Sequence, residues 1–151
     1  MRLAVLELEL EADSADAVIN RLAEGMAERG FVRPGYGAAV RERERVSPTG
    51  LPARGAGVAI PHADPEFVLV PAIGFAKLTR PVFFGEMGNP EAAVPVQLVF
   101  MLAIRDSEGQ LDALRRLIQF IQDDERLNML KRARDKDAAL AVLRNVFGKF
   151  E

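Results

Sequence analysis

His62 is the only histidine of the chain, and it follows the small apolar run Gly57–Ile60 and Pro61. Proline removes a backbone donor and ends regular strand pairing, so we expect the imidazole at the rim of a sheet. There a neutral ring nitrogen can act as a nucleophile or move a proton. An isolated histidine can equally be a surface or hydrogen-bonded structural residue, and these alternatives stay open on this segment alone.

Further segments stand in a specific order and spacing around His62. They are Arg43-Glu44, Pro48-Thr49-Gly50, Ala59-Ile60-Pro61-His62-Ala63, Phe84-Gly85-Glu86-Met87-Gly88, Val96 to Ala103, and a Leu-rich helix from Gln110 to Gln122. Together they resemble the enzyme IIA components of the bacterial sugar phosphotransferase system, in the mannitol/fructose structural class. The galactitol type is the most similar. The resemblance covers most of the chain.

This resemblance implies a phosphocarrier. His62 would accept a phosphoryl group from the histidine-containing phosphocarrier protein and pass it to a cysteine of a IIB component, for uptake of a sugar or sugar alcohol. Such transfer needs a neutral imidazole, donors placed around the phosphoryl oxygens, and no cofactor. Two alternatives remain: a nitrogen-regulatory IIA-like protein that acts as a phosphorylation-dependent binding module, and a domain that only binds partners.

The resemblance also nominates phosphate-supporting residues. Arg43 begins the Arg-Glu-x-x-x-Pro-Thr motif, and a guanidinium can donate two parallel hydrogen bonds to a phosphoryl group. Thr49 adds a hydroxyl, and Gly50 and Gly55 would let backbone amides approach an anion. The alternatives are a surface ion pair for Arg43, within a run of alternating charge, and a turn for Thr49.

By the same resemblance, Gln110 stands at the position where the mannitol and fructose types have a second histidine, beside the active one. A glutamine amide can donate a hydrogen bond to a phosphoryl oxygen or to the imidazole, but it does not titrate near neutral pH. The alternative is a capping-box glutamine that folds back onto Ser107 at the start of a helix. That helix start could itself attract an anion.

The composition excludes several classes of protein. The 151 residues are 49% hydrophobic and 28% charged, with a net charge of −2 and no cysteine. Thiol chemistry and disulfides are therefore excluded. One histidine falls short of the several nitrogen or sulfur ligands that a zinc site usually has, so we expect no metal. No basic cluster suggests nucleic-acid binding, and no apolar run is long enough to insert into a membrane. With an alternating strand pattern at the start instead of a leader, we expect a cytoplasmic protein.

The elements that must position these residues alternate between strand and helix. Leu6, Leu8 and Leu10 alternate with glutamates and predict a half-exposed strand, and Asp13-Ser14 caps a helix that ends near Gly30. A short helix is expected at 38–44. Strands are expected within 67–78 and at 81–85, followed by a loop at 86–93 and a strand at 95–104 buried on both faces.

Three helices complete the chain: one capped by Ser107 with an inward stripe that includes Leu111, Leu117 and Ile118, one at 127–133, and one at 137–147. Strands interleaved with helices of this length predict an α/β fold. We expect one layered domain over residues 1–151, with a mixed, mostly parallel β-sheet flanked by helices.

Overall fold

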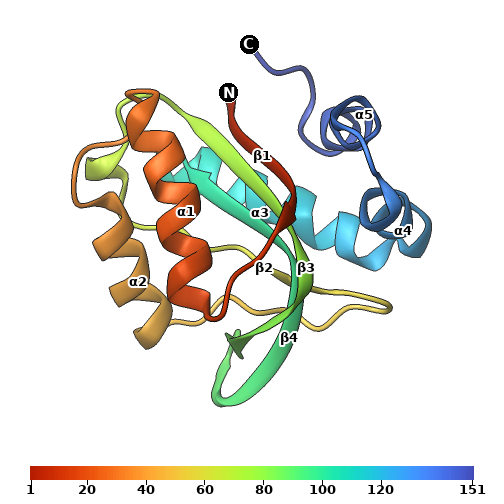
Figure 1. Ribbon diagram of the computed structural model, residues 1–151. Coiled ribbons are helices and arrows are strands. Elements are labelled where there is room, and N and C mark those ends of the chain that lie inside the picture. Colours follow the sequence, from red (N-terminus) through yellow and green to blue (C-terminus); the bar gives the residue numbers. More distant parts are fainter.

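A computed structural model describes residues 1–151 (Figure 1). The chain combines strands with helices, as the periodicity predicts, but the elements come in groups and do not alternate one by one. In order, the elements are β1 (Arg2–Leu10), α1 (Ala15–Glu28), α2 (Tyr36–Val46), β2 (Gly57–Ala59), the 3₁₀ turn η1 (Pro65–Phe67), β3 (Ala72–Glu86), β4 (Asn89–Ala103), α3 (Ser107–Gln122), α4 (Asp124–Arg132) and α5 (Lys136–Phe147).

The four strands form one sheet in the order β1-β3-β4-β2. Strand β1 runs parallel to β3, and β2 runs parallel to β4, whereas β3 and β4 form an antiparallel hairpin. The sheet is therefore mixed and mostly parallel, and the predicted α/β class is confirmed. Figure 1 shows α1 and α2 on one side of the sheet and α3, α4 and α5 on the other.

Strand β4 shows why both faces are covered. Leu98, Phe100 and Leu102 enter the hydrophobic cluster beneath α3 to α5, and the alternate residues Val99 and Met101 enter the cluster beneath α1 and α2. Side chains of a strand alternate between the two faces, so a continuously apolar strand fits only between two helical layers. The prediction of a central strand buried on both faces is confirmed.

The prediction that residues 67–93 form separate strands within 67–78 and at 81–85, followed by a loop at 86–93, is wrong. Strand β3 begins only at Ala72 and continues through Pro81 to Glu86, and the predicted loop 86–93 shrinks to a turn at Met87 and Gly88. The register of the hairpin shifts between Lys77 and Val82. Proline is tolerated in a strand at such an irregularity, so Pro81 marks a bulge and not a strand end.

Helix α1 begins as predicted, because the Ser14 hydroxyl accepts a hydrogen bond from the amide of Ala17 at 3.1 Å. The predicted start of α3 lies one residue too late. Asp106 is the cap and accepts from the amide of Gly109 at 2.6 Å, so Ser107 is the first helical residue. The capping-box interpretation of Gln110 is therefore wrong, since it requires Ser107 at the cap position.

The inward stripe of α3 also differs from the prediction. Ala113, Leu117 and Phe120 are buried, whereas Leu111 and Ile118 are 49% and 38% exposed. The Phe120 ring packs edge-on against Phe100 at a centroid distance of 6.0 Å. Burying this large ring turns the helix so that Leu111 and Ile118 face outward.

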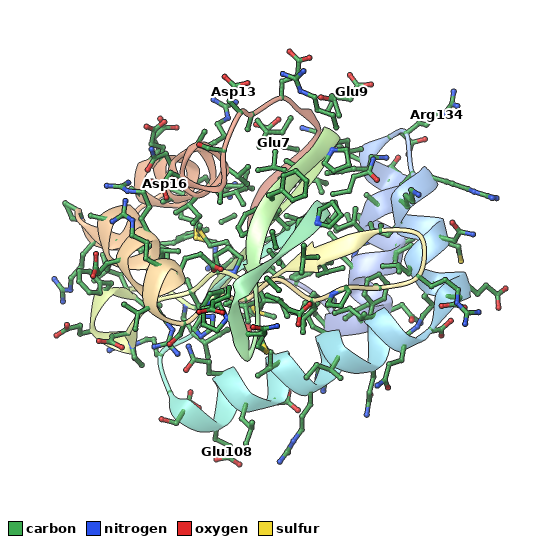
Figure 2. The ribbon with its side chains drawn as sticks, turned by 90° about the horizontal axis from the view of Figure 1, so that it is seen from below. Glu7, Glu9, Asp13, Asp16, Glu108 and Arg134 are labelled. Atoms are coloured by element: carbon green, nitrogen blue, oxygen red, sulfur yellow. The ribbon has the colours of Figure 1, made fainter.

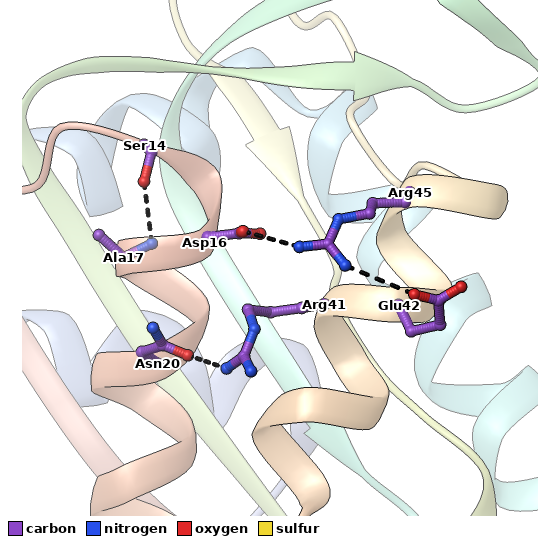
Figure 3. A network of polar contacts seen from close by, with 7 residues as sticks. All are labelled: Ser14, Asp16, Ala17, Asn20, Arg41, Glu42 and Arg45. Atoms are coloured by element: carbon purple, nitrogen blue, oxygen red, sulfur yellow. Dashed lines mark hydrogen bonds and ion pairs between the residues drawn. The ribbon is translucent and has the colours of Figure 1, made fainter.

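Polar contacts join α1 to α2 (Figure 3). Arg45 donates to Asp16 at 3.1 Å and to Glu42 at 3.4 Å, and Arg41 donates to Asn20. Two arginines of the alternating run are thus engaged on the side of α2 that faces α1. Figure 2 shows other charges on the outside of the molecule, with Glu9, Asp13 and Glu108 directed outward.

None of the helices combines the length and the apolar character needed to cross a membrane.

Candidate functional site

His62 lies where the short strand β2 has ended, beside the last residues of β4. The amide of Leu102 donates to the carbonyl of Pro61 at 3.1 Å, and an isolated parallel bridge pairs His62 with Leu102. The His62 side chain is half-buried, between the buried residues Pro61 and Ala63. The lone imidazole therefore stands at the rim of the sheet, on backbone that is hydrogen-bonded to the central strand.

One imidazole nitrogen of His62 is already engaged. Nδ1 lies 2.8 Å from the carbonyl oxygen of Ile60. A carbonyl oxygen can only accept, so Nδ1 carries the proton and donates it. In the neutral ring the lone pair then resides on Nε2, which makes no hydrogen bond within the chain. This nitrogen is available as a nucleophile.

The surroundings keep the ring neutral. Burial lowers the pKa of His62 below its ordinary value of 6.5, and the nearby positive charge of Arg43 lowers it further. The hydrogen bond to Ile60 and the charge of Asp64 act in the opposite direction, but burial is the largest influence. At neutral pH the lone pair of Nε2 is therefore not lost to a proton.

Arg43 is exposed on α2 and forms neither an ion pair nor a side-chain hydrogen bond, unlike its neighbours Arg41 and Arg45. Its charge is nevertheless felt at His62 and at Glu44, since it lowers the pKa of both. The structure thus brings an unpaired guanidinium and the imidazole near each other.

Thr49 is buried, and its hydroxyl is fully engaged. Oγ1 donates to Oε1 of Glu44 at 2.8 Å and accepts from the amide of Ile60 at 3.0 Å. Its own amide donates to Oε2 of Glu44 at 2.7 Å. The hydroxyl that the sequence suggested as a phosphate donor lies beneath the histidine segment in this structure, and it is bonded to a carboxylate.

Gly50 is also engaged elsewhere. Its amide donates to the carbonyl of Gly85 at 2.9 Å, and a Cβ at this position would lie 2.5 Å from that oxygen. A glycine is required here because the loop pairs closely with the end of β3. The expectation that the Gly50 amide faces an anion is therefore wrong.

Gln110 lies in the first turn of α3 and is half-buried. Its side chain makes no hydrogen bond within the chain, and none joins it to His62. Its amide group therefore has no partner within the chain. The start of α3 is less suited to an anion than the sequence suggested, because the carboxylate of Asp106 already accepts a first-turn amide and Glu108 adds a second negative charge.

Sequence reasoning missed Tyr36, the only tyrosine. Its hydroxyl donates to the carbonyl of Leu102 at 2.6 Å, on the residue whose amide holds Pro61. Burial raises the pKa of Tyr36, which stays protonated as this donor role requires. A single tyrosine at the start of a helix gives no signal of this contact, because its partner is a backbone carbonyl 66 residues away.

No group of three potential metal ligands occurs in the structure. The arrangement instead offers a neutral, oriented imidazole with a free Nε2, an unpaired arginine near it and a glutamine with an unbound amide. These groups suit nucleophilic attack on an anionic electrophile whose negative oxygens need donors.

Comparison with known sequences agrees with this chemistry. The chain is 37% identical to the transcriptional regulator ManR of Bacillus subtilis over 101 residues, and this aligned region covers 67% of the chain. It is 30% identical over 142 residues to a fructose-specific EIIABC component of the same organism, and 34% identical over 105 residues to a nitrogen regulatory protein of Bradyrhizobium diazoefficiens. The chain spans 14%, 21% and 63% of these relatives.

Solved structures share the fold. The crystal structure of IIA mannitol from Escherichia coli has a TM-score of 0.73 and 25% identity, covering 92% of this chain and 94% of that one. A solution structure of Escherichia coli enzyme IIA mannitol in complex with phosphorylated enzyme IIB mannitol has a TM-score of 0.75, 24% identity and 93% coverage of both chains.

A family model matches residues 3–146, nearly the whole chain, and its description is the phosphoenolpyruvate-dependent sugar phosphotransferase system, EIIA 2. Components of this family are phosphotransferases that pass phosphoryl groups through a histidine. The chain therefore belongs to the EIIA type 2 family of the sugar phosphotransferase system.

Proposed function

We propose that this protein carries a phosphoryl group on Nε2 of His62, taken from the histidine-containing phosphocarrier protein and delivered to a IIB component. The observation that carries this proposal is the hydrogen bond from Nδ1 of His62 to the carbonyl of Ile60, at 2.8 Å. It leaves the lone pair on the other nitrogen, on a ring whose pKa is lowered.

In the forward step, the Nε2 lone pair attacks the phosphorus of the donor phosphohistidine. The bond between phosphorus and the donor nitrogen breaks, and the donor ring leaves with that electron pair. Positive charge develops on the His62 ring as its nitrogen binds phosphorus. The Ile60 carbonyl then accepts from a more acidic N–H, so the same hydrogen bond strengthens as the reaction proceeds.

Arg43 and Gln110 are proposed to contact the phosphoryl oxygens. Arg43 has no ion pair to break, and Gln110 has an unbound amide. Two parallel donors from a guanidinium would neutralise the oxygens as charge shifts among them. Thr49 supports the site from below, through Glu44 and Ile60.

The acceptor is proposed to be a IIB protein. Support comes from the fold shared with enzyme IIA mannitol, whose solved complex contains phosphorylated enzyme IIB mannitol. Leu111 and Ile118 on α3 are large apolar side chains left exposed, as a surface that meets proteins requires. The sequence resemblance and Gln110 favour a galactitol-like sugar alcohol as the cargo of that system.

A regulatory role is a second candidate. It is favoured by the similarity to a nitrogen regulatory protein and to the regulator ManR. In that role the phosphoryl group would stop on His62 and change which protein binds.

The distinguishing experiment supplies labelled phosphoryl groups through the phosphocarrier protein, then adds purified IIB domains of the galactitol, mannitol and fructose types one at a time. Rapid transfer to the galactitol-type IIB supports the full proposal, and transfer to another type corrects the cargo. Label that stays on His62 with every IIB favours the regulatory role. A chain that accepts no label contradicts both functions.

A further inference from the structure

Glu44 is a buried carboxylate that the proposed transfer chemistry does not use. Glu44 and Thr49 are the two buried polar or charged side chains of the chain, 9% and 4% exposed, and they bond to each other. Removing a carboxylate from water is costly, and burial raises the pKa of Glu44. Its hydrogen bonds from Thr49 offset part of this cost.

The geometry of the pair fixes the direction of each hydrogen bond. Both oxygens of Glu44 are accepting, one from the amide of Thr49 at 2.7 Å and one from its hydroxyl at 2.8 Å. Because the hydroxyl proton points to Glu44, the lone pairs of Oγ1 are left to accept the amide proton of Ile60 at 3.0 Å. An ionised Glu44 thus makes the Thr49 oxygen an obligatory acceptor.

The same residue Ile60 orients the imidazole. Its amide is held by Thr49, its side chain is fully buried, and the residue after it is a proline with a fixed φ. These contacts restrain the Ile60 peptide, whose carbonyl oxygen lies 2.8 Å from Nδ1 of His62. Hydrogen bonds and one peptide segment connect Glu44 to the ring without a break.

Resting on the proposed function, we infer that Glu44 is a positioning residue: through Thr49 and Ile60 it holds the carbonyl that keeps the proton of His62 on Nδ1 and the lone pair on Nε2. Glu44 directly follows Arg43 on α2. One turn of this helix therefore carries both Arg43, the proposed donor to the phosphoryl oxygens, and Glu44, which positions His62.

The test uses the full chain with Glu44→Gln and Thr49→Val. The control is Glu42→Gln, which removes a charge from the same helix at an exposed side chain paired only with Arg45. Thr49→Val keeps the shape but leaves the Ile60 amide without its acceptor. Glu44→Gln replaces an accepting oxygen by an NH₂ group that faces the donors of Thr49. Thr49→Ser retains the hydroxyl and tests rescue.

Two readouts separate positioning from a merely structural contribution. Nitrogen-15 NMR of the only imidazole reports its tautomer, and we expect both variants to lose part of the Nδ1–H form. The rate constant for accepting label should fall about 10- to 100-fold, as misplacement of a reacting group does, with the KM for the phosphocarrier protein unchanged. Thr49→Ser should recover most of the loss, and Glu42→Gln should match the original chain.

The inference is overturned if folded Glu44→Gln and Thr49→Val keep both the tautomer and the rate of the unaltered chain. A rise in KM alone would also contradict it. If Thr49→Val does not fold, Glu44→Gln carries the comparison. If the unaltered chain takes no label on His62, the proposed function fails, whereas the tautomer measurement still decides whether Glu44 positions the ring.

Discussion

Nδ1 of His62 donates to the carbonyl oxygen of Ile60, two residues earlier, across 2.8 Å. This short local contact decides which nitrogen of the ring can react. It also lies at the end of the chain of bonds that starts at Glu44, so the buried side of the site bears directly on the tautomer.

The protonation of His62 can be followed without assignment, because the chain contains one histidine. We expect its NMR titration to give a pKa below the ordinary value of 6.5, since burial disfavours the charged ring. The neutral form should show the proton on Nδ1. A pKa above 6.5, or a proton on Nε2, would contradict this description of the ring.

The lowered pKa of His62 also has a consequence for stability. A folded state with a depressed pKa binds the proton more weakly than the unfolded chain does. The resulting stabilisation is present above pH 6.5 and is lost as the pH falls through the folded-state pKa. We therefore expect the free energy of unfolding of the original chain, relative to that of His62→Gln, to decrease on acidification. Urea titrations at about pH 7.5, 6.5 and 5.5 measure this difference. If the original chain instead became more stable relative to His62→Gln on acidification, the pKa of His62 would be raised by folding, contrary to this prediction.

Arg43→Lys keeps the charge but loses the planar pair of donors. We expect phosphoryl acceptance to slow about tenfold or more, as the loss of a charge-assisted hydrogen bond predicts, with unchanged unfolding. Arg45→Lys is the matched control, because Arg45 is paired with Asp16 and Glu42 on the same helix. Equal rates for the two variants would make Arg43 an ordinary surface residue.

Phe100 lies at the centre of the core beneath α3 to α5. Its ring lies 5.0 Å from that of Phe75 and 6.0 Å from that of Phe120. Phe100→Ala should cost about 3–5 kcal/mol of unfolding free energy, because it leaves a cavity. Phe83, 68% exposed on the paired strand, is the control, and Phe83→Ala should change stability by about 0.5 kcal/mol or less. Similar losses for both would contradict the assigned packing.

The sequence predicted the layered fold because its strongest patterns are local. The apolar continuity of the second half of β4 and the Ser14 cap of α1 depend on neighbours in sequence, and both lie where they were predicted, although β4 begins earlier, at Asn89. Pro81 misled the prediction of β3, because a bulge absorbs a proline only when a partner strand is present. Asp106 and Ser107 are both good cap residues, and the sequence alone does not choose between them.

Candidate site residues could be named from the sequence where they stand in a motif, and not where they stand in a pattern with an ordinary structural meaning. The lone His62 after a proline, and Arg43 through the family motif, were named as candidates in this way. Glu44 was hidden in a run of alternating charge, which usually means a solvated helix face. Its burial depends on α2 packing over Thr49, a tertiary contact that periodicity does not encode.

The most direct test of the account is to label the chain through the phosphocarrier protein and to compare it with His62→Gln. We predict one label per chain, lost in acid and kept in alkali as expected for a phosphoramidate, and carried on Nε2 in the phosphorus NMR coupling pattern. His62→Gln should fold and accept none. A labelled His62→Gln, or a label that survives acid and is lost in alkali, would contradict the central claim.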